Sequence, residues 1–142
     1  MQVRDLMNSS VVSITPEEST ALAARLLSRH NVGSLPVCAE DGRLRGIVTD
    51  RDIVTRCVAA EEDPARTPVR DIMSRSCTVV SPDDDPREAT RLMAAQQVRR
   101  LPVVEEGRLV GMVSLGDLAT SHRFDMETSK ALCEISEPVR RA

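Results

Sequence analysis

The chain has 142 residues, of which 41% are hydrophobic and 29% are charged, and its formal net charge is −3. These values are ordinary for a globular protein, and the length allows one medium domain or two small domains that share a core. No apolar run approaches the roughly 18 residues of a membrane span, so we expect no membrane insertion. The N-terminus lacks the basic and apolar regions of a signal peptide, so we expect a cytoplasmic protein.

The balance of charge and the scarcity of aromatic residues argue against nucleic-acid binding. Acidic and basic residues are mixed along the chain, which gives no basic patch for duplex nucleic acid. Phe124 is the only aromatic residue among Phe, Trp and Tyr. Proteins that read single strands usually stack bases on aromatic rings. Any base bound by this chain would lie between aliphatic side chains and backbone.

The sequence contains an internal repeat. Residues 3–40 align with residues 69–106, and after a gap at Asp41 residues 42–54 align with residues 107–119. The shared segments include Val-Arg-Asp at 3–5 and 69–71, and Leu-Pro-Val at 35–37 and 101–103. A repeat of this length, in conserved order along the chain, indicates a duplicated structural unit.

In chain order, the first copy opens with a turn over residues 3–7. Residues 11–14 are rich in β-formers and end at Thr15-Pro16, which predicts a short strand. Apolar residues at helical spacing predict a helix over 19–29. Residues 35–38 and 44–49 flank a turn at 40–42 and predict a hairpin. A second helix then begins at Asp50 or Asp52.

The second copy repeats this order. Residues 77–80 predict the strand, and Ala89, Leu92 and Met93 mark the first helix. Each copy is therefore β-α-β-β-α, and the fold class is α+β. Because a unit of about fifty residues has little core of its own, we expect the two copies to pair with pseudo-twofold symmetry.

The division along the chain follows from the repeat. We expect the first repeat at 1–60, a polar linker at 61–68, the second repeat at 69–120 and a helical extension at 121–142. The extension contains a short helix with one apolar face, which ends at Pro138. That face consists of Phe124, Thr128, Ala131, Leu132 and Ile135.

The repeated segments resemble a known family. Asp5-Leu6-Met7, Leu35-Pro36-Val37 and the heptapeptide at 46–52, Gly-Ile-Val-Thr-Asp-Arg-Asp, are similar to the motifs of the CBS domain. So are Asp71-Ile72-Met73, Leu101-Pro102-Val103 and the heptapeptide at 111–117. The resemblance covers residues 3–119, and the whole resembles short stand-alone bacterial proteins made of one tandem CBS pair, or Bateman module.

This resemblance implies a regulatory module without catalysis of its own. Such pairs commonly hold AMP, ADP, ATP or S-adenosylmethionine in two clefts between the repeats, and report nucleotide state to a protein partner. Two pairs usually associate into a disc-like homodimer. No cofactor is required. Some stand-alone members bind no nucleotide, so the fold alone leaves the ligand open.

Four polar residues are the main candidates for ligand binding. Thr49 and Ser114 lie where a strand passes into a helix, and a hydroxyl there suits a phosphate. Asp52 and Asp117 follow three residues later, where a carboxylate can accept both hydroxyl protons of a ribose. The alternative is plain helix capping for the hydroxyls and a favourable first-turn charge for the carboxylates. One residue can serve both purposes.

Other candidates complete the expected sites. Gly46 and Gly111 lack a Cβ, which lets a ligand or a neighbouring strand approach the backbone. Arg99 and Arg100 can bind a phosphate tail bidentately, or can be a solvated surface pair. Since the first copy has Gly33-Ser34 there, and Asp50 beside Thr49, we expect the second copy to be the better anion site. The candidates to hold the adenine, which are core residues on the alternative interpretation, are Ile14, Val80, Val32 and Val98.

Two other classes of function compete with nucleotide sensing. An enzyme is disfavoured, because the sequence has no nucleophile elbow, no P-loop and no paired histidines. A structural dimerisation module, regulated by redox state or a metal, is the alternative. The four cysteines, Cys38, Cys57, Cys77 and Cys133, are widely separated, as are His30 and His122. We therefore expect reduced, mostly buried cysteines and no metal site.

Overall fold

The computed structural model describes residues 1–120 and 134–135, and its backbone forms two compact units. One unit contains Val12–Cys77 with Gly107–Leu109, and is called here the first-hairpin unit. The other contains Met1–Val11, Thr78–Glu106 and the chain from Val110 onward, and is called the second-hairpin unit. None of the helices in the described part is long and apolar enough to cross a membrane.

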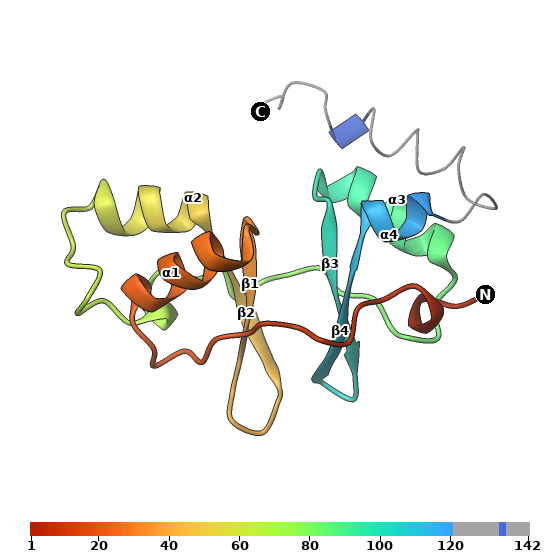
Figure 1. Cartoon of the computed structure of the whole chain (residues 1–142), viewed down its shortest axis with the longest axis horizontal. Helices are drawn as coiled ribbons and strands as arrows, with labels where there is room; N and C mark the ends of the chain where they lie inside the picture. Colours follow the sequence, from red (N-terminus) through yellow and green to blue (C-terminus); the bar gives the residue numbers. More distant parts are fainter. Residues whose placement is uncertain (121–133, 136–142) are drawn as a thin grey trace. The chain divides into compact units, whose positions relative to one another are not determined.

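The first-hairpin unit is built on an antiparallel pair of strands. Strand β1 (Ser34–Cys38) pairs with β2 (Leu44–Thr49), with Pro36 opposite Ile47 and a bulge between Val37 and Cys38. Helices α1 (Thr20–His30) and α2 (Asp50–Ile53) pack against each other and against this hairpin (Figure 1). A π-helical turn (Val54–Val58) continues α2, and a 3₁₀ turn (Val69–Asp71) follows later in the chain.

The ends of α1 are determined by local chemistry. The Ser19 side chain accepts a hydrogen bond from the Leu22 N–H at 3.1 Å, which caps the N-terminus. Asn31 closes the helix in the left-handed conformation, with φ at 52°, and the Val32 N–H donates to the Leu27 carbonyl. This cap also fixes where the chain leaves the helix and enters β1.

The second-hairpin unit has the same order of elements, but different residues cap its first helix. It contains a 3₁₀ turn (Val3–Asp5), α3 (Pro86–Gln96), β3 (Arg100–Glu105), β4 (Arg108–Ser114) and α4 (Leu115–Ala119). Asp85 caps α3, Pro86 occupies its first position, and Gln97 closes it with φ at 54°. Strands β3 and β4 form the second two-stranded sheet, and the first two residues of β4 belong to the first-hairpin unit.

Each unit has its own apolar core. In the first-hairpin unit the core joins α1 and the hairpin to the second 3₁₀ turn, through Val69, Ile72 and Met73. In the second-hairpin unit, Val3 from the first 3₁₀ turn packs among α3, β3, β4 and α4. The turn that opens each sequence repeat is therefore buried in the compact unit formed by the hairpin and helices of the other repeat.

The predicted hairpins and the helices within the two repeats are confirmed, and the expected turns at the start of each repeat contain 3₁₀ turns. The predicted strands at 11–14 and 77–80 are each reduced to a single bridge. Ile14 pairs with Val37, and Val80 with Val103, both in parallel. In the parallel ladder around Ile14, the next hydrogen bond toward the N-terminus would need a backbone N–H on Pro36 as its donor. The next hydrogen bond toward the C-terminus would need one on Pro16. Pro102 and Pro82 block the bridge at Val80 in the same way. Proline has no N–H, so neither ladder can extend.

Most of the predicted C-terminal helix lies outside the described residues, including Phe124, Thr128, Ala131 and Leu132. Ile135 is described, and it packs half-buried against the core of the second-hairpin unit. The Gln97 side chain donates to the Glu134 carbonyl at 3.3 Å.

Candidate functional site

The four polar candidates form two matching capping boxes. The Asp52 N–H donates to Thr49 Oγ1 at 3.0 Å, and the Thr49 N–H donates to Asp52 Oδ2 at 3.0 Å. In the second copy, Asp117 N–H to Ser114 Oγ measures 3.0 Å and Ser114 N–H to Asp117 Oδ2 measures 2.8 Å. These four residues therefore do cap their helices, as the alternative interpretation of the sequence expected. Each box still leaves one carboxylate oxygen and one hydroxyl proton for another partner.

The second carboxylate oxygen, the one outside the capping box, has different surroundings in the two aspartates. Asp52 is buried, and its Oδ1 lies 3.9 Å from the Nε of Arg56. Asp117 is half-buried, and within the described residues its second oxygen has no ion pair or hydrogen bond. Arg56 was not among the residues singled out from the sequence. Its spacing, four residues after Asp52 on one helical face, is the sequence signal that could have identified it.

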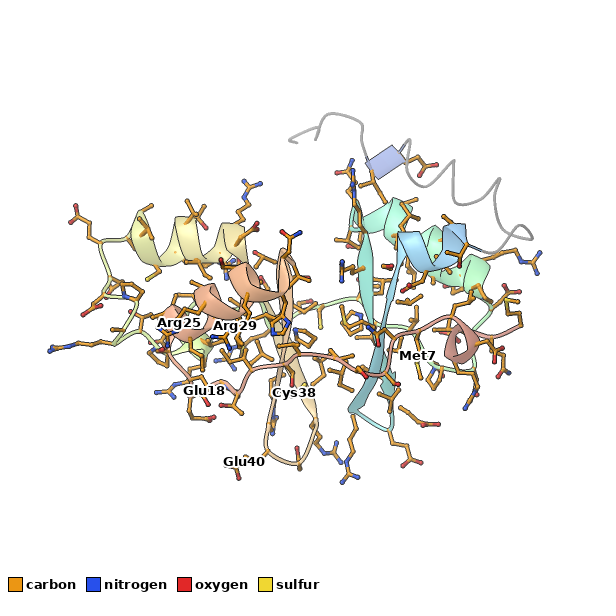
Figure 2. The ribbon with its side chains drawn as sticks, viewed as in Figure 1. Met7, Glu18, Arg25, Arg29, Cys38 and Glu40 are labelled. Carbon is orange, nitrogen blue, oxygen red and sulfur yellow. The ribbon has the colours of Figure 1, made fainter. Side chains whose placement is uncertain are left out.

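Gly46 and Gly111 make room for neighbouring chain. A Cβ on Gly46 would clash with the carbonyl oxygen of Ser74, and one on Gly111 would lie 2.7 Å from Met7 Sδ (Figure 2). Of the two possibilities left open by the sequence, a neighbouring segment occupies this space in both copies. These glycines can still shape a ligand site, but only indirectly.

The backbone brings the start of each first strand to the start of the following helix. The Asp50 N–H donates to the Gly33 carbonyl at 3.1 Å, and the Leu115 N–H donates to the Arg99 carbonyl at 2.8 Å. Arg99 therefore lies directly beside the Ser114 capping box. The side chains of Arg99 and Arg100 are exposed, and neither forms an ion pair within the described residues. The matching place in the first copy holds Gly33, with Asp50 Oδ2 near it.

The four apolar candidates divide into two kinds. Ile14 and Val80 are buried in the two cores, where each bridges to its hairpin. Val32 is half-buried at the end of α1, and Val98 is 37% exposed at the end of α3. Ile14 and Val80 therefore serve packing within their own units, whereas Val98 exposes part of its side chain to solvent.

The thiols lie in apolar surroundings. Cys38, Cys57 and Cys77 are free, and Cys133 lies outside the described residues. Burial raises the pKa of the Cys38 and Cys77 thiols above the usual value of 9.0. Within residues 1–120 and 134–135, no cluster of His, Cys, Asp or Glu has the composition of a metal site. These cysteines are poor nucleophiles at neutral pH.

A shallow hollow in the first-hairpin unit is lined by Glu17, Ala39, Glu40 and Asp41. Figure 2 shows Glu40 near the end of the β1–β2 hairpin. Three carboxylates would repel a phosphate, so this hollow is no candidate for a nucleotide.

Comparison with known proteins identifies the repeat. The CBS domain matches the chain twice, over residues 3–59 and 69–122. The chain belongs to the CBS domain family. It is 41% identical to the CBS domain-containing protein YhcV of Bacillus subtilis, and the alignment covers 94% of both chains. It is a tandem CBS pair of the short type.

Solved structures of CBS proteins carry ligands. Hypoxic response protein 1 of Mycobacterium tuberculosis is 39% identical over 82% of this chain and 81% of its own length. A crystal structure of hypoxic response protein I, with two coordinated zinc ions, has a TM-score of 0.78 at 37% identity and covers 84% of this chain and 98% of that one. The CBS domain pair of protein MJ0100, in complex with 5′-methylthioadenosine and S-adenosylmethionine, has a TM-score of 0.73 at 26% identity, over 84% of this chain and 98% of that one.

Proposed function

We propose that this CBS pair is a regulatory module that binds an adenosine ligand beside the Ser114–Asp117 capping box. The observation that carries the proposal is the carboxylate oxygen of Asp117 that no described residue binds, in a capping box whose helix starts beside the backbone of Arg99. The side chains of Arg99 and Arg100 are exposed. A carboxylate can accept from a ribose diol, and two guanidinium groups can bind a phosphate or a carboxylate tail. AMP, ADP, ATP and S-adenosylmethionine all combine a ribose with such a tail.

The equivalent residues of the first repeat, Thr49 and Asp52, form a weaker site on this proposal. Asp50 places a negative charge where the second repeat has the neutral Leu115. The exposed Gly33 stands where Arg99 stands in the second repeat. An anionic tail is therefore attracted to one repeat and not to the other.

The proposal is of binding without catalysis, with the signal passed to a protein partner. YhcV and hypoxic response protein 1 are covered by the alignments over 94% and 81% of their lengths, which leaves little room in them for a catalytic domain. The adenosyl ligands of the MJ0100 pair support an adenosine ligand here.

The test is a thermal-shift panel of AMP, ADP, ATP, S-adenosylmethionine and NAD. A ligand at a hundred times its dissociation constant stabilises the folded state by about 2.7 kcal/mol. Because the chain has no Trp and no Tyr, unfolding is followed by calorimetry or a dye. We expect at least one of the first four ligands to raise the Tm. A panel without any shift would refute nucleotide sensing.

A metal-responsive module is the second candidate, favoured by the two zinc ions in the structure of hypoxic response protein I. It predicts stoichiometric zinc in the purified protein, by elemental analysis. Regulation by redox state instead predicts a disulfide, and therefore fewer than four titratable thiols after denaturation without reductant. Zinc-free protein with all four thiols titratable would reject it.

A further inference from the structure

The two repeats differ at one side chain that contacts the proposed ribose acceptor. Both aspartates give one oxygen, Oδ2, to their capping box. The other oxygen is the only one left for a ligand. In the first repeat this oxygen, Oδ1 of Asp52, faces the guanidinium of Arg56, whose Nε is 3.9 Å away.

The Nη1 side of the Arg56 guanidinium group holds the side chain in this position. Its Nη1 donates to the carbonyl oxygens of Ile72 and Met73, at 3.2 Å each. Ile72 and Met73 are buried in the core of the same unit. If the guanidinium turned away from Asp52, it would lose two charge-assisted hydrogen bonds and leave two carbonyls without that donor. The π-helical turn carries Arg56 at its centre, and π turns inside helices recur at functional sites.

Among its described residues, the second repeat has no such cation beside Asp117. The residue equivalent to Arg56 is Ser121, which is neutral and too short to form an ion pair with a carboxylate. Asp117 has no ion pair within the described residues, and it is more exposed than Asp52, which is 8% exposed. Within residues 1–120 and 134–135, a ribose hydroxyl can therefore reach Asp117 without displacing an ion-pair partner, but it must displace Arg56 to reach Asp52.

We infer that Arg56 withholds Asp52 from a ribose, so that each chain binds one adenosine ligand, at Asp117. This inference rests on the proposed function, and it assigns Arg56 as the residue that decides how many sites the chain has. Arg56 acts by occupying the acceptor and by closing the space around a buried carboxylate.

The experiment is isothermal titration with AMP, and separately with S-adenosylmethionine. We expect one molar equivalent bound per chain by the unaltered protein and two by Arg56→Met, which keeps the aliphatic stem. The double variant Arg56→Met, Asp52→Ala should return to one. Arg25→Met is the matched control, because Arg25 is an exposed arginine of α1 without a partner among the described residues (Figure 2), and we expect it to bind one equivalent.

The same titration separates the sites through Asp117. Asp117→Ala should weaken binding by about 10- to 150-fold, the range for a lost charged hydrogen bond. In the Arg56→Met background it should leave one equivalent bound, at Asp52. Should Arg56→Met fail to fold, Arg56→Gln serves instead, because it removes the charge that faces Asp52 and keeps a polar end on this half-exposed side chain.

The outcomes distinguish the two proposals. An unaltered protein that binds two equivalents, or an Arg56 variant that still binds one, overturns the role of Arg56 and leaves nucleotide sensing intact. No binding of either ligand by any variant overturns nucleotide sensing, and the role of Arg56 with it.

Discussion

Ser74 and Ile47 exchange both of their backbone hydrogen bonds, each at 2.9 Å. Asn8 and Met112 make the matching exchange in the other unit, at 2.8 and 2.9 Å. The segment that follows each 3₁₀ turn therefore forms an added bridge on the hairpin of the opposite repeat. Neither repeat folds only on itself, which gives a physical reason for the repeat to occur as a pair.

This pairing requires a glycine in the hairpin. A Cβ on Gly46 would meet the Ser74 carbonyl oxygen, a backbone atom that cannot move without breaking the pair. We predict that Gly46→Ala destabilises the protein by about 1–3 kcal/mol, the usual cost of overpacking. Urea denaturation followed by a dye measures the loss.

Gly33→Ala is the control for that substitution. Its Cβ would lie 3.7 Å from Asp50 Oδ2, an ordinary contact, and its φ is not in the left-handed region. We expect a change within about 0.5 kcal/mol. Equal losses at Gly46 and Gly33 would show that the contact with Ser74 does not constrain the hairpin.

The sequence predicted the features that depend on neighbours along the chain. The helix expected over 19–29 and the hairpin around the turn at 40–42 are both present, because the interactions that form them lie within a few residues. The boundary between β2 and α2, expected at Thr49, is formed by the capping box of Thr49 and Asp52. These are local choices of backbone conformation, and local residue chemistry determines them.

The features that the sequence did not predict depend on which distant segments meet. Repetition alone does not say whether the turn at 69–71 packs with its own repeat or with the other one. The strands are shortened because Pro36 and Pro102 stand where the ladder needs a backbone N–H. Predicting this requires knowledge of the register in which the strands pair. Arg56 was overlooked because its carbonyl partners, Ile72 and Met73, lie 16 and 17 residues away.

The exposed apolar surface supports a homodimer. On α1 and α3, Leu27 and Met93 are buried within their own units, whereas Leu26 and Leu92 are half-buried. Val54 and Val58 are 58% and 61% exposed and lie four residues apart. We predict that a second copy covers these two valines.

Light scattering on a sizing column tests this. We expect twice the chain mass of 15.6 kDa at micromolar concentration. Val58→Glu should shift the protein toward the monomer, since it would bury a charge without a partner. Val79→Glu, at another exposed valine, should leave the mass unchanged. A monomeric unaltered protein would defeat the prediction.

The buried cysteines predict a loss of stability at alkaline pH. Burial raises the pKa of Cys38 and Cys77, so the folded state keeps these protons to higher pH than the unfolded chain does. Their contribution is complete below the unfolded-state pKa and is lost as the pH rises through the folded-state values. We expect a flat free energy of unfolding from pH 7 to about pH 8, and a fall above about pH 9.

The repeat supplies a matched variant for that measurement. Val104 and Val11 occupy the positions equivalent to Cys38 and Cys77. Cys38→Val with Cys77→Val should therefore pack acceptably and reduce the alkaline loss. The chain has no Tyr, so no phenol titrates in this range. An unchanged alkaline loss in the double variant would assign it to other groups.

The arginines beside the Ser114 capping box predict how binding depends on the ligand tail. Arg99 and Arg100 carry the only charges proposed to meet a phosphate, whereas the adenosine is held by Asp117 and apolar contacts. Replacing both arginines by Ala should weaken ATP by about 1.5–3 kcal/mol for each charged hydrogen bond lost, and adenosine hardly at all. Raising the salt concentration should weaken ATP binding in the unaltered protein and less so in the double variant, because exposed charges are screened.

Arg25→Ala with Arg29→Ala removes the same charge from the exposed face of α1 and should leave both affinities unchanged (Figure 2). Isothermal titration at two salt concentrations measures each affinity, and equal losses for ATP and adenosine would place the arginines away from the tail.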